Sequence, residues 1–242
     1  MTESLLLACT QISTFWGATL LTRASGFFFE RDGRLHVVTS RHVVFDPGNA
    51  HAPDRIGIDV HVDRVDLTRV ATVALPLYDR GTATWRQATD TGGEIDVATV
   101  PIDRAALPSG AAFEVFTPDH LQANLDEVEI GAPLSIVGFP LGFHDTTHHL
   151  PVARQAAVAS AFGVRFQGRG WFLTDARTHR GMSGAPVVMR APAGAAAGTL
   201  PWRLLGIHST RMDMGSRDLV QDESLGLNGA WYADVLRALT EG

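Results

Sequence analysis

The sequence predicts an all-β protein, either a barrel or a sandwich. The first observation behind this is a series of short apolar runs, rich in Val, Ile, Phe and Thr, which turn residues separate. The second is the spread of 24 glycines and 12 prolines along the 242 residues, which is typical of a chain with many turns. Helical periodicity is convincing only near the end of the chain. Together these patterns favour many strands and few helices.

The predicted strands follow one another along the chain. The first two flank Asp32-Gly33, a dipeptide typical of a tight hairpin turn. The closing segment predicts a helix, because Trp231, Val235, Leu236 and Leu239 recur at helical spacing. The expected strands are 25–30, 34–40, 56–62, 68–77, 95–102, 133–139, 171–175, 185–189 and 203–209.

Composition and charge narrow the function classes. The formal net charge of -6 argues against a nucleic-acid binder, which usually presents a basic face. No apolar run is long enough for a membrane span, and Cys9 is the single cysteine. We therefore expect a cytoplasmic protein that binds neither nucleic acid nor a membrane. We expect no cofactor and no metal, because His144, His148 and His149 lack an acid or cysteine at a familiar ligand spacing.

Ser183 lies between two glycines, Gly181 and Gly184, where side chains leave the backbone uncovered. A serine nucleophile needs a base and backbone N–H groups that bind the oxyanion formed when it attacks a carbonyl. Gly181 would let its own N–H and that of Ser183 point the same way. A plain surface turn also explains the glycines, but it does not explain the apolar strand that follows at once.

Two further segments supply the missing parts of such a site. His42 comes just after a predicted buried strand, so its side chain would be firmly held. Asp96 lies between Ile95 and Val97 at the start of another strand, where a carboxylate needs a partner because burying it alone is costly. Each has a simpler reading, a hydrogen-bonded histidine at a strand end and a capping or turn aspartate.

Taken together, the three motifs resemble the trypsin/chymotrypsin-like serine peptidases. "TSRHV", "EIDVATV" and "GMSGAP" are similar to the family's histidine, aspartate and serine segments, in the same order. The resemblance implies two antiparallel six-stranded β-barrels with a C-terminal α-helix. It places an N-terminal barrel with His42 and Asp96 in residues 1–118. It places the C-terminal barrel, with Ser183, the specificity pocket and the closing helix, in residues 119–242.

The resemblance also assigns roles. His42 would be the general base and acid, Asp96 would hold its tautomer, and Ser183 would form the acyl-enzyme. The N–H groups of Gly181 and Ser183 would form the oxyanion hole. Met182 replaces the acid that usually precedes the serine. Since that acid pairs with a new N-terminus in the family's zymogens, we expect no activation by N-terminal trimming.

The residues beside the nucleophile suggest a cleavage preference. Thr178 stands five positions before the serine and His208 follows in a Gly-x-His segment, an arrangement that resembles glutamyl endopeptidases and 3C-like peptidases. Both side chains can donate to a carboxylate or amide oxygen. The resemblance places Arg177, six positions before the serine, at the floor of the pocket. Because Arg177 is not acidic, cleavage after Lys or Arg is disfavoured, and its positive charge favours a negatively charged substrate side chain. With Ser209 completing the substrate-binding set, the pattern predicts cleavage after Glu or Gln.

The leading hypothesis is a serine endopeptidase that acts on protein or peptide substrates. One alternative is a peptidase fold that binds a partner protein or peptide and cuts slowly or never. Another is an esterase of small acyl groups that uses the same triad. Because free proteolysis in the cytoplasm is harmful, we expect the activity of this protein to be controlled, and narrow specificity, a regulatory protein partner or a mobile rim loop could supply the control. The segment 211–228 is expected to form the rim of the pocket.

Overall fold

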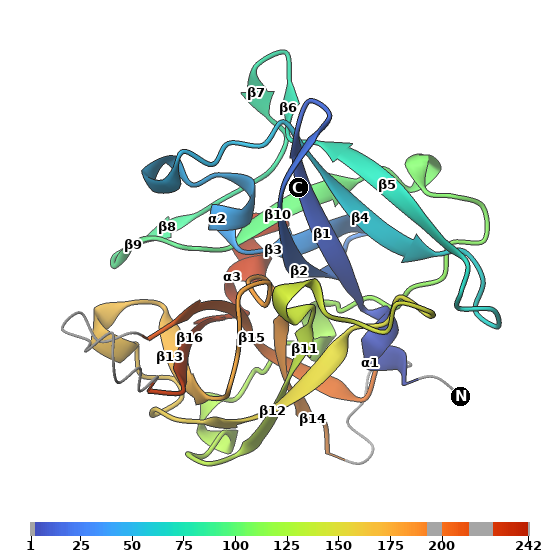
Figure 1. The fold of residues 1–242 in the computed structure, drawn as a ribbon. Helices are drawn as coiled ribbons and strands as arrows, with labels where there is room; N and C mark the ends of the chain where they lie inside the picture. Colours follow the sequence, from blue (N-terminus) through green and yellow to red (C-terminus); the bar gives the residue numbers. More distant parts are fainter. Residues whose placement is uncertain (1–2, 193–199, 213–224, 242) are drawn as a thin grey trace, which may run out of the picture.

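Two six-stranded antiparallel sheets make up most of the fold and lie one above the other in Figure 1. The computed structural model describes residues 3–192, 200–212 and 225–241. The predicted rim segment therefore lies largely outside the described residues. The expected trypsin-like fold of two six-stranded β-barrels is confirmed, one barrel being closed and the other a curled half-barrel sheet.

The first sheet contains the strands of the N-terminal half. Asp32 and Gly33 form its β2–β3 turn with φ of 51° and 75°, as a tight hairpin requires. In spatial order its strands are β10 (Ala98–Ile102), β3 (Arg34–Thr39), β2 (Thr19–Arg31), β1 (Cys9–Trp16), β4 (Arg55–His61) and β5 (Val70–Pro76).

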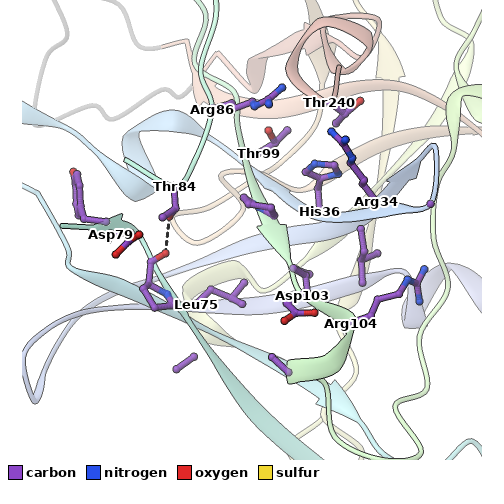
Figure 2. Close-up of a pocket in the computed structure, with 18 of the residues that line it drawn as sticks. Arg34, His36, Leu75, Asp79, Thr84, Arg86, Thr99, Asp103, Arg104 and Thr240 are labelled. Atoms are coloured by element: carbon purple, nitrogen blue, oxygen red, sulfur yellow. Dashed lines mark hydrogen bonds between the residues drawn. The ribbon is translucent and has the colours of Figure 1, made fainter. Parts of the chain in front are cut away.

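This first sheet curls without closing, because β5 and β10 remain its two edges. Pro76 and Pro101 lie on these edges and have no N–H to donate across the gap. A cavity of about 920 Å³ occupies the seam, with His36, Arg86 and Thr99 on its walls (Figure 2). The described residues that line it include none of those that the sequence singled out for catalysis.

The second sheet closes into a barrel. Its strands are, in order around the barrel, β11 (Pro133–Gly138), β12 (Val152–Val158), β13 (Trp171–Asp175), β16 (Leu227–Tyr232), β15 (Trp202–Arg211) and β14 (Pro186–Arg190). The closing helix α3 (Val235–Leu239) is shorter than the periodicity suggested, because Trp231 belongs to strand β16 and not to the helix.

The remaining elements are short. The other α-helices are α1 (Ser4–Leu7) and α2 (Arg41–Val44), and two small hairpins pair β6 (Tyr78–Asp79) with β7 (Thr82–Ala83) and β8 (Thr89–Asp90) with β9 (Gly93–Glu94). Single 3₁₀ turns occur at Pro47–Asn49, Arg104–Ala106, Pro118–His120, Leu125–Glu127, Pro140–Gly142 and Phe166–Gly168. Among the described residues, no helix is long and apolar enough to cross a membrane.

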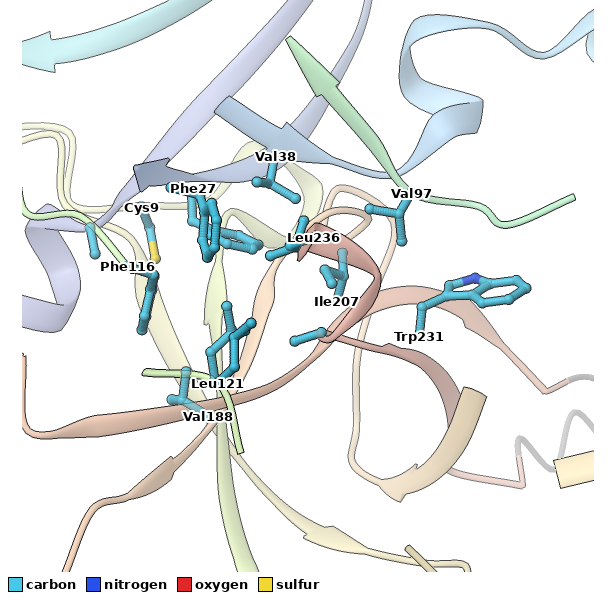
Figure 3. Close-up of a cluster of buried hydrophobic side chains, with 14 of the residues drawn as sticks. Cys9, Phe27, Val38, Val97, Phe116, Leu121, Val188, Ile207, Trp231 and Leu236 are labelled. Carbon is cyan, nitrogen blue, oxygen red and sulfur yellow. The ribbon is translucent and has the colours of Figure 1, made fainter. Parts of the chain in front are cut away.

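A continuous apolar cluster joins the two sheets. Phe27 and Val38 of the first sheet, Val188 and Ile207 of the second and Leu236 of α3 are each fully buried in it (Figure 3). Removing a side chain of this size from water contributes about 1.5–3 kcal/mol. Each sheet also has an apolar cluster of its own. The interface is therefore a core in its own right, and it fixes the position of one sheet against the other.

The sheets also touch backbone to backbone at Gly184. Its φ is +84°, and a Cβ at this position would lie 2.3 Å from both the Ser25 carbonyl oxygen and Thr39 Oγ1. We predict that Gly184→Ala lowers the free energy of unfolding by about 3 kcal/mol or more, because φ strain and overpacking add. Urea unfolding followed by tryptophan fluorescence measures the loss.

Gly33→Ala is the matched control for this prediction. Gly33 also has a positive φ, +75°, but a Cβ there would meet nothing within 4 Å. We therefore expect a loss of only about 1 kcal/mol from the φ strain. Equal losses in the two variants would show that the contact between the sheets at Gly184 is not tight.

Candidate active site

Two contacts lock the His42 ring to Asp96. His42 lies on α2, directly after strand β3, and buried Val43 and Val44 anchor this short helix. The His42 backbone N–H donates to Asp96 Oδ1 at 2.8 Å, and ring atom Nδ1 lies 2.7 Å from Asp96 Oδ2. Since the carboxylate can only accept, Nδ1 carries the proton and Nε2 has the free lone pair.

A third group holds the Asp96 carboxylate. Ser209 Oγ donates to Asp96 Oδ2 at 2.5 Å. The sequence grouped Ser209 with the substrate-binding residues, but the structure directs its hydroxyl to the carboxylate. The three hydrogen bonds fix the orientation of the carboxylate.

The electrostatics of His42 follow from this arrangement. Burial of the ring works to lower its pKa, but the hydrogen bond and negative charge of Asp96 outweigh it, and Asp46 adds to them. The net effect raises the pKa of His42 above its ordinary value of 6.5. The ring is thereby made a stronger base, as proton abstraction from a hydroxyl requires.

Ser183 lies across the interface from this pair, on the turn before strand β14. Its Oγ is 3.4 Å from the Ser209 carbonyl oxygen. Within the described residues, no hydrogen bond joins Ser183 Oγ to the His42 ring, and Nε2 of His42 has no partner. Both side chains line the same cavity. Contacts between a nucleophile and its base are often long without substrate and shorten when substrate binds.

Two backbone N–H groups beside Ser183 are left free. Leu141 N–H donates to the Arg180 carbonyl at 2.6 Å, and Ala185 N–H donates to the Met182 carbonyl at 2.9 Å. Since the peptide bonds of the described residues are all trans, each of these carbonyls points away from the N–H of its own peptide unit. The N–H groups of Gly181 and Ser183 therefore face the other way, and neither has an acceptor among the described residues.

A family comparison identifies the domain that contains these residues. Residues 24–194 match the family described as the trypsin-like peptidase domain. The chain belongs to this family.

Solved structures show the same fold at low sequence identity. The serine endoprotease from Yersinia pestis superposes with a TM-score of 0.56 at 15% identity, over 98% of this chain and 65% of that one. The active form of the Rv3671c protease from M. tuberculosis gives 0.53 at 14% identity, over 97% and 80%. This chain thus spans just under two thirds of the Yersinia protein. No curated protein sequence matches it.

In this trypsin-like peptidase domain, a cavity of about 760 Å³ surrounds Ser183. Its walls come from α2 and loops beside the first sheet, from strands and loops of the second sheet, and from the β8–β9 hairpin. The residues that line it are Arg41, His42, Asp46, Gly92, Gly93, Glu94, Asp96, Arg169, Trp171, His179, Arg180, Ser183, His208, Ser209, Thr210, Arg211 and Trp231. The structure therefore brings four of the predicted side chains, His42, Asp96, Ser183 and Ser209, into one cavity with His208.

His208 is 2% exposed, and burial lowers the pKa of its ring to about 4, with the positive charges of His42 and Arg211 adding to the effect. The ring is therefore neutral at neutral pH. Its Nδ1 has no partner among the described residues. A neutral imidazole at the cavity wall can still donate one hydrogen bond to a ligand oxygen.

The two other predicted pocket residues lie elsewhere. Thr178 is buried, but its Oγ1 donates to Asn228 Oδ1 at 2.5 Å. Arg177 is exposed, and its backbone carbonyl accepts a bond from Arg154 Nε at 3.0 Å. Neither belongs to the cavity lining. Thr178 and Arg177 therefore do not line the cavity that His208 lines.

Sequence reasoning missed several residues of this region. Glu94 pairs with Arg41 at 2.6 Å at the cavity wall, and Asn228, 1% exposed, holds Thr178. The only sequence signal for the Glu94–Arg41 ion pair was the Gly-Gly-Glu segment that comes just before the aspartate motif. A lone asparagine in an apolar strand, which needs polar partners once buried, could have indicated the second. Among the described residues, no cluster of His, Cys, Asp and Glu could hold a metal ion.

Proposed function

We propose that this protein is a serine endopeptidase with His42, Asp96 and Ser183 as its catalytic residues. The observation that carries the proposal is the hold of Asp96 on both the backbone and the ring of His42, in a cavity that also contains Ser183. The free N–H groups of Gly181 and Ser183 support it further. Membership of the trypsin-like peptidase family supports peptide-bond hydrolysis as the reaction.

The proposed steps use this chain's own groups. Ser183 Oγ attacks the substrate carbonyl carbon while His42 Nε2 takes the hydroxyl proton, and the carbonyl oxygen becomes an oxyanion bound by the two free N–H groups. His42 then gives its proton to the leaving amine, and the C–N bond breaks to leave an acyl-enzyme. Water attacks this ester in the same way and regenerates Ser183.

We further propose cleavage after Glu or Gln, with His208 as the residue that recognises the side chain. A neutral donor serves a carboxylate and an amide oxygen alike, so both residues are accepted. Arg180 and Arg211 line the same cavity and have no carboxylate partner among the described residues, which favours Glu. Thr178 acts indirectly in this proposal, through its bond to Asn228.

One observation favours the second candidate, a binding module that cuts slowly or never. In this structure Ser183 Oγ contacts the Ser209 carbonyl and not the His42 ring. A side chain that stayed in this rotamer would not transfer its proton to Nε2. Such a protein would bind peptides in the same cavity without forming an acyl-enzyme.

Labelling with a fluorophosphonate probe separates the two candidates. We predict that the wild-type protein forms a covalent adduct at Ser183. We expect Ser183→Ala to abolish this adduct, and His42→Ala to slow its formation by at least about 10⁴-fold because the base is lost. Mass spectrometry of the intact protein measures the adduct. A folded wild-type protein that stays unlabelled would favour the binding module.

The pH dependence of hydrolysis tests the role of His42. Protonated His42 cannot accept the Ser183 proton, so activity is lost as the pH falls through its raised pKa. We predict that kcat/KM rises with pH with a midpoint above 6.5. Asp46→Asn should move the midpoint down slightly, because Asp46 contributes a smaller share of the raised pKa. A midpoint at or below 6.5 in the wild type would contradict the proposed pairing.

An unbiased peptide-library profile tests the cleavage preference. We predict cleavage after Glu and Gln in the wild type, and a loss of about 10- to 100-fold in His208→Leu for these substrates, because one hydrogen bond to the side chain is removed. Thr178→Val is the matched control, and its effect should stay within about threefold. An equal loss in the two variants would mean that Thr178 binds substrate directly. A wild-type profile of Arg, Phe or Ala alone would reject the preference.

A further inference from the structure

Ser25 links the two loops that surround the free N–H groups, although it belongs to the other sheet. It lies in strand β2 and is completely buried. Its Oγ donates to the Gly181 carbonyl at 2.7 Å and accepts from the Phe139 N–H at 2.9 Å. The hydroxyl has one proton, so these two contacts use it as both donor and acceptor. Nothing in the sequence motifs singled out this side chain.

The first contact fixes the peptide unit that follows Gly181. Ser25 holds its carbonyl, and its N–H, from Met182, donates to the His179 carbonyl at 3.2 Å. A peptide unit held at both ends cannot rotate about the chain. Gly181 has φ +91°, and a Cβ there would lie 2.5 Å from the Phe139 carbonyl oxygen, so the position requires glycine. Glycine is the residue least able to hold its own conformation.

The second contact fixes the peptide unit that precedes Gly181. Phe139, whose N–H Ser25 accepts, begins the turn that contains Leu141. The Leu141 N–H holds the Arg180 carbonyl, and this hold turns the Gly181 N–H of the same trans peptide unit away from Leu141. The Ser25 backbone N–H also donates to the Ser183 carbonyl at 3.0 Å. Ser25 therefore acts on the peptide units before and after Gly181 and on the nucleophile residue.

We propose that Ser25 is a positioning residue for the oxyanion hole: its buried hydroxyl, supplied by the first sheet, sets the direction of the Gly181 N–H in the second. It does not touch substrate. Without the hydroxyl, the Gly181 carbonyl loses its partner, so the peptide unit after this flexible residue is held at its N–H end alone. The turn that holds the peptide unit before Gly181 loses its anchor at the Phe139 N–H. The inference rests on the proposed function, because only an attacking Ser183 needs this N–H.

The test compares Ser25→Ala with Thr10→Val. Thr10 is a matched control, because its 1% exposed hydroxyl also bridges backbone groups, donating to the Asp59 carbonyl at 2.8 Å and accepting from the Asp59 N–H at 3.0 Å. Thr10 lies in strand β1 and does not line the Ser183 cavity. Each variant removes a hydroxyl that donates to one backbone carbonyl and accepts from one backbone N–H of another segment, so a merely structural role predicts the same outcome for both.

The readout is the rate of fluorophosphonate labelling, resolved into the maximum rate constant and the half-saturating probe concentration. For Ser25→Ala we expect the rate constant to fall about 10- to 100-fold with the half-saturating concentration unchanged. A misdirected N–H still stabilises the oxyanion in part, so the loss is smaller than when an oxyanion-hole donor is removed. For Thr10→Val we expect both within about twofold of wild type. Ser25→Cys keeps a weak donor and should fall between Ser25→Ala and wild type.

The outcomes separate the two proposals. If the wild-type protein does not label, the proposed function fails and this inference fails with it. If the wild type labels and Ser25→Ala matches Thr10→Val, only the role of Ser25 is overturned. If Ser25→Ala does not fold, judged by its circular dichroism, Ser25→Cys decides: labelling at the wild-type rate overturns the inference, and intermediate labelling supports it.

Discussion

The contact between strand β2 and the turn around Ser183 is the constraint on which the rest of the site depends. Here two backbones from different sheets approach so closely that Gly184 has no room for a side chain, and the Ser25 N–H reaches the Ser183 carbonyl. Such an approach needs both sheets to be rigid and correctly placed. The apolar cluster between them, with Phe27 and Ile207, supplies this placement. The polar geometry at the cavity is therefore a consequence of sheet packing.

The two histidines of the cavity show how one environment can shift pKa values in opposite directions. Both rings are buried enough for desolvation to disfavour their charged form. His42 has a carboxylate partner that more than offsets this, whereas His208 has none and sits beside positive charges. If His42 takes a proton, as the proposed function requires, the Asp96 carboxylate is in place as its counterion. His208 stays neutral and does not compete for that counterion.

The sequence predicted the fold class and most strands, because half-buried strands show up as short apolar runs. Strands β1 and β12 were missed because their polar residues hide the alternation of apolar and polar positions. Trp231 suggested a helix because a spacing of four residues from Trp231 to Val235 is compatible with a helix or a strand. The order of the three motifs indicated which side chains meet. Contacts made by single hydroxyls, such as Thr178 with Asn228 or Ser25 with Gly181, leave no pattern in the sequence, because they join positions 50 and 156 residues apart.

The environment of Met182 explains why hydrogen bonds to the backbone, and not an acidic side chain at this position, order the turn around Ser183. Its side chain is completely buried and packs in the apolar cluster of the second sheet, beside Ala185. A carboxylate in its place would be desolvated among apolar groups, at a cost that only a buried cation could offset. The turn instead gains its order from the carbonyls of Arg180, Gly181 and Ser183, each held by a donor from another segment. Those donors come from segments that the two sheets hold in place, so the packing of the sheets contributes to the order of this turn.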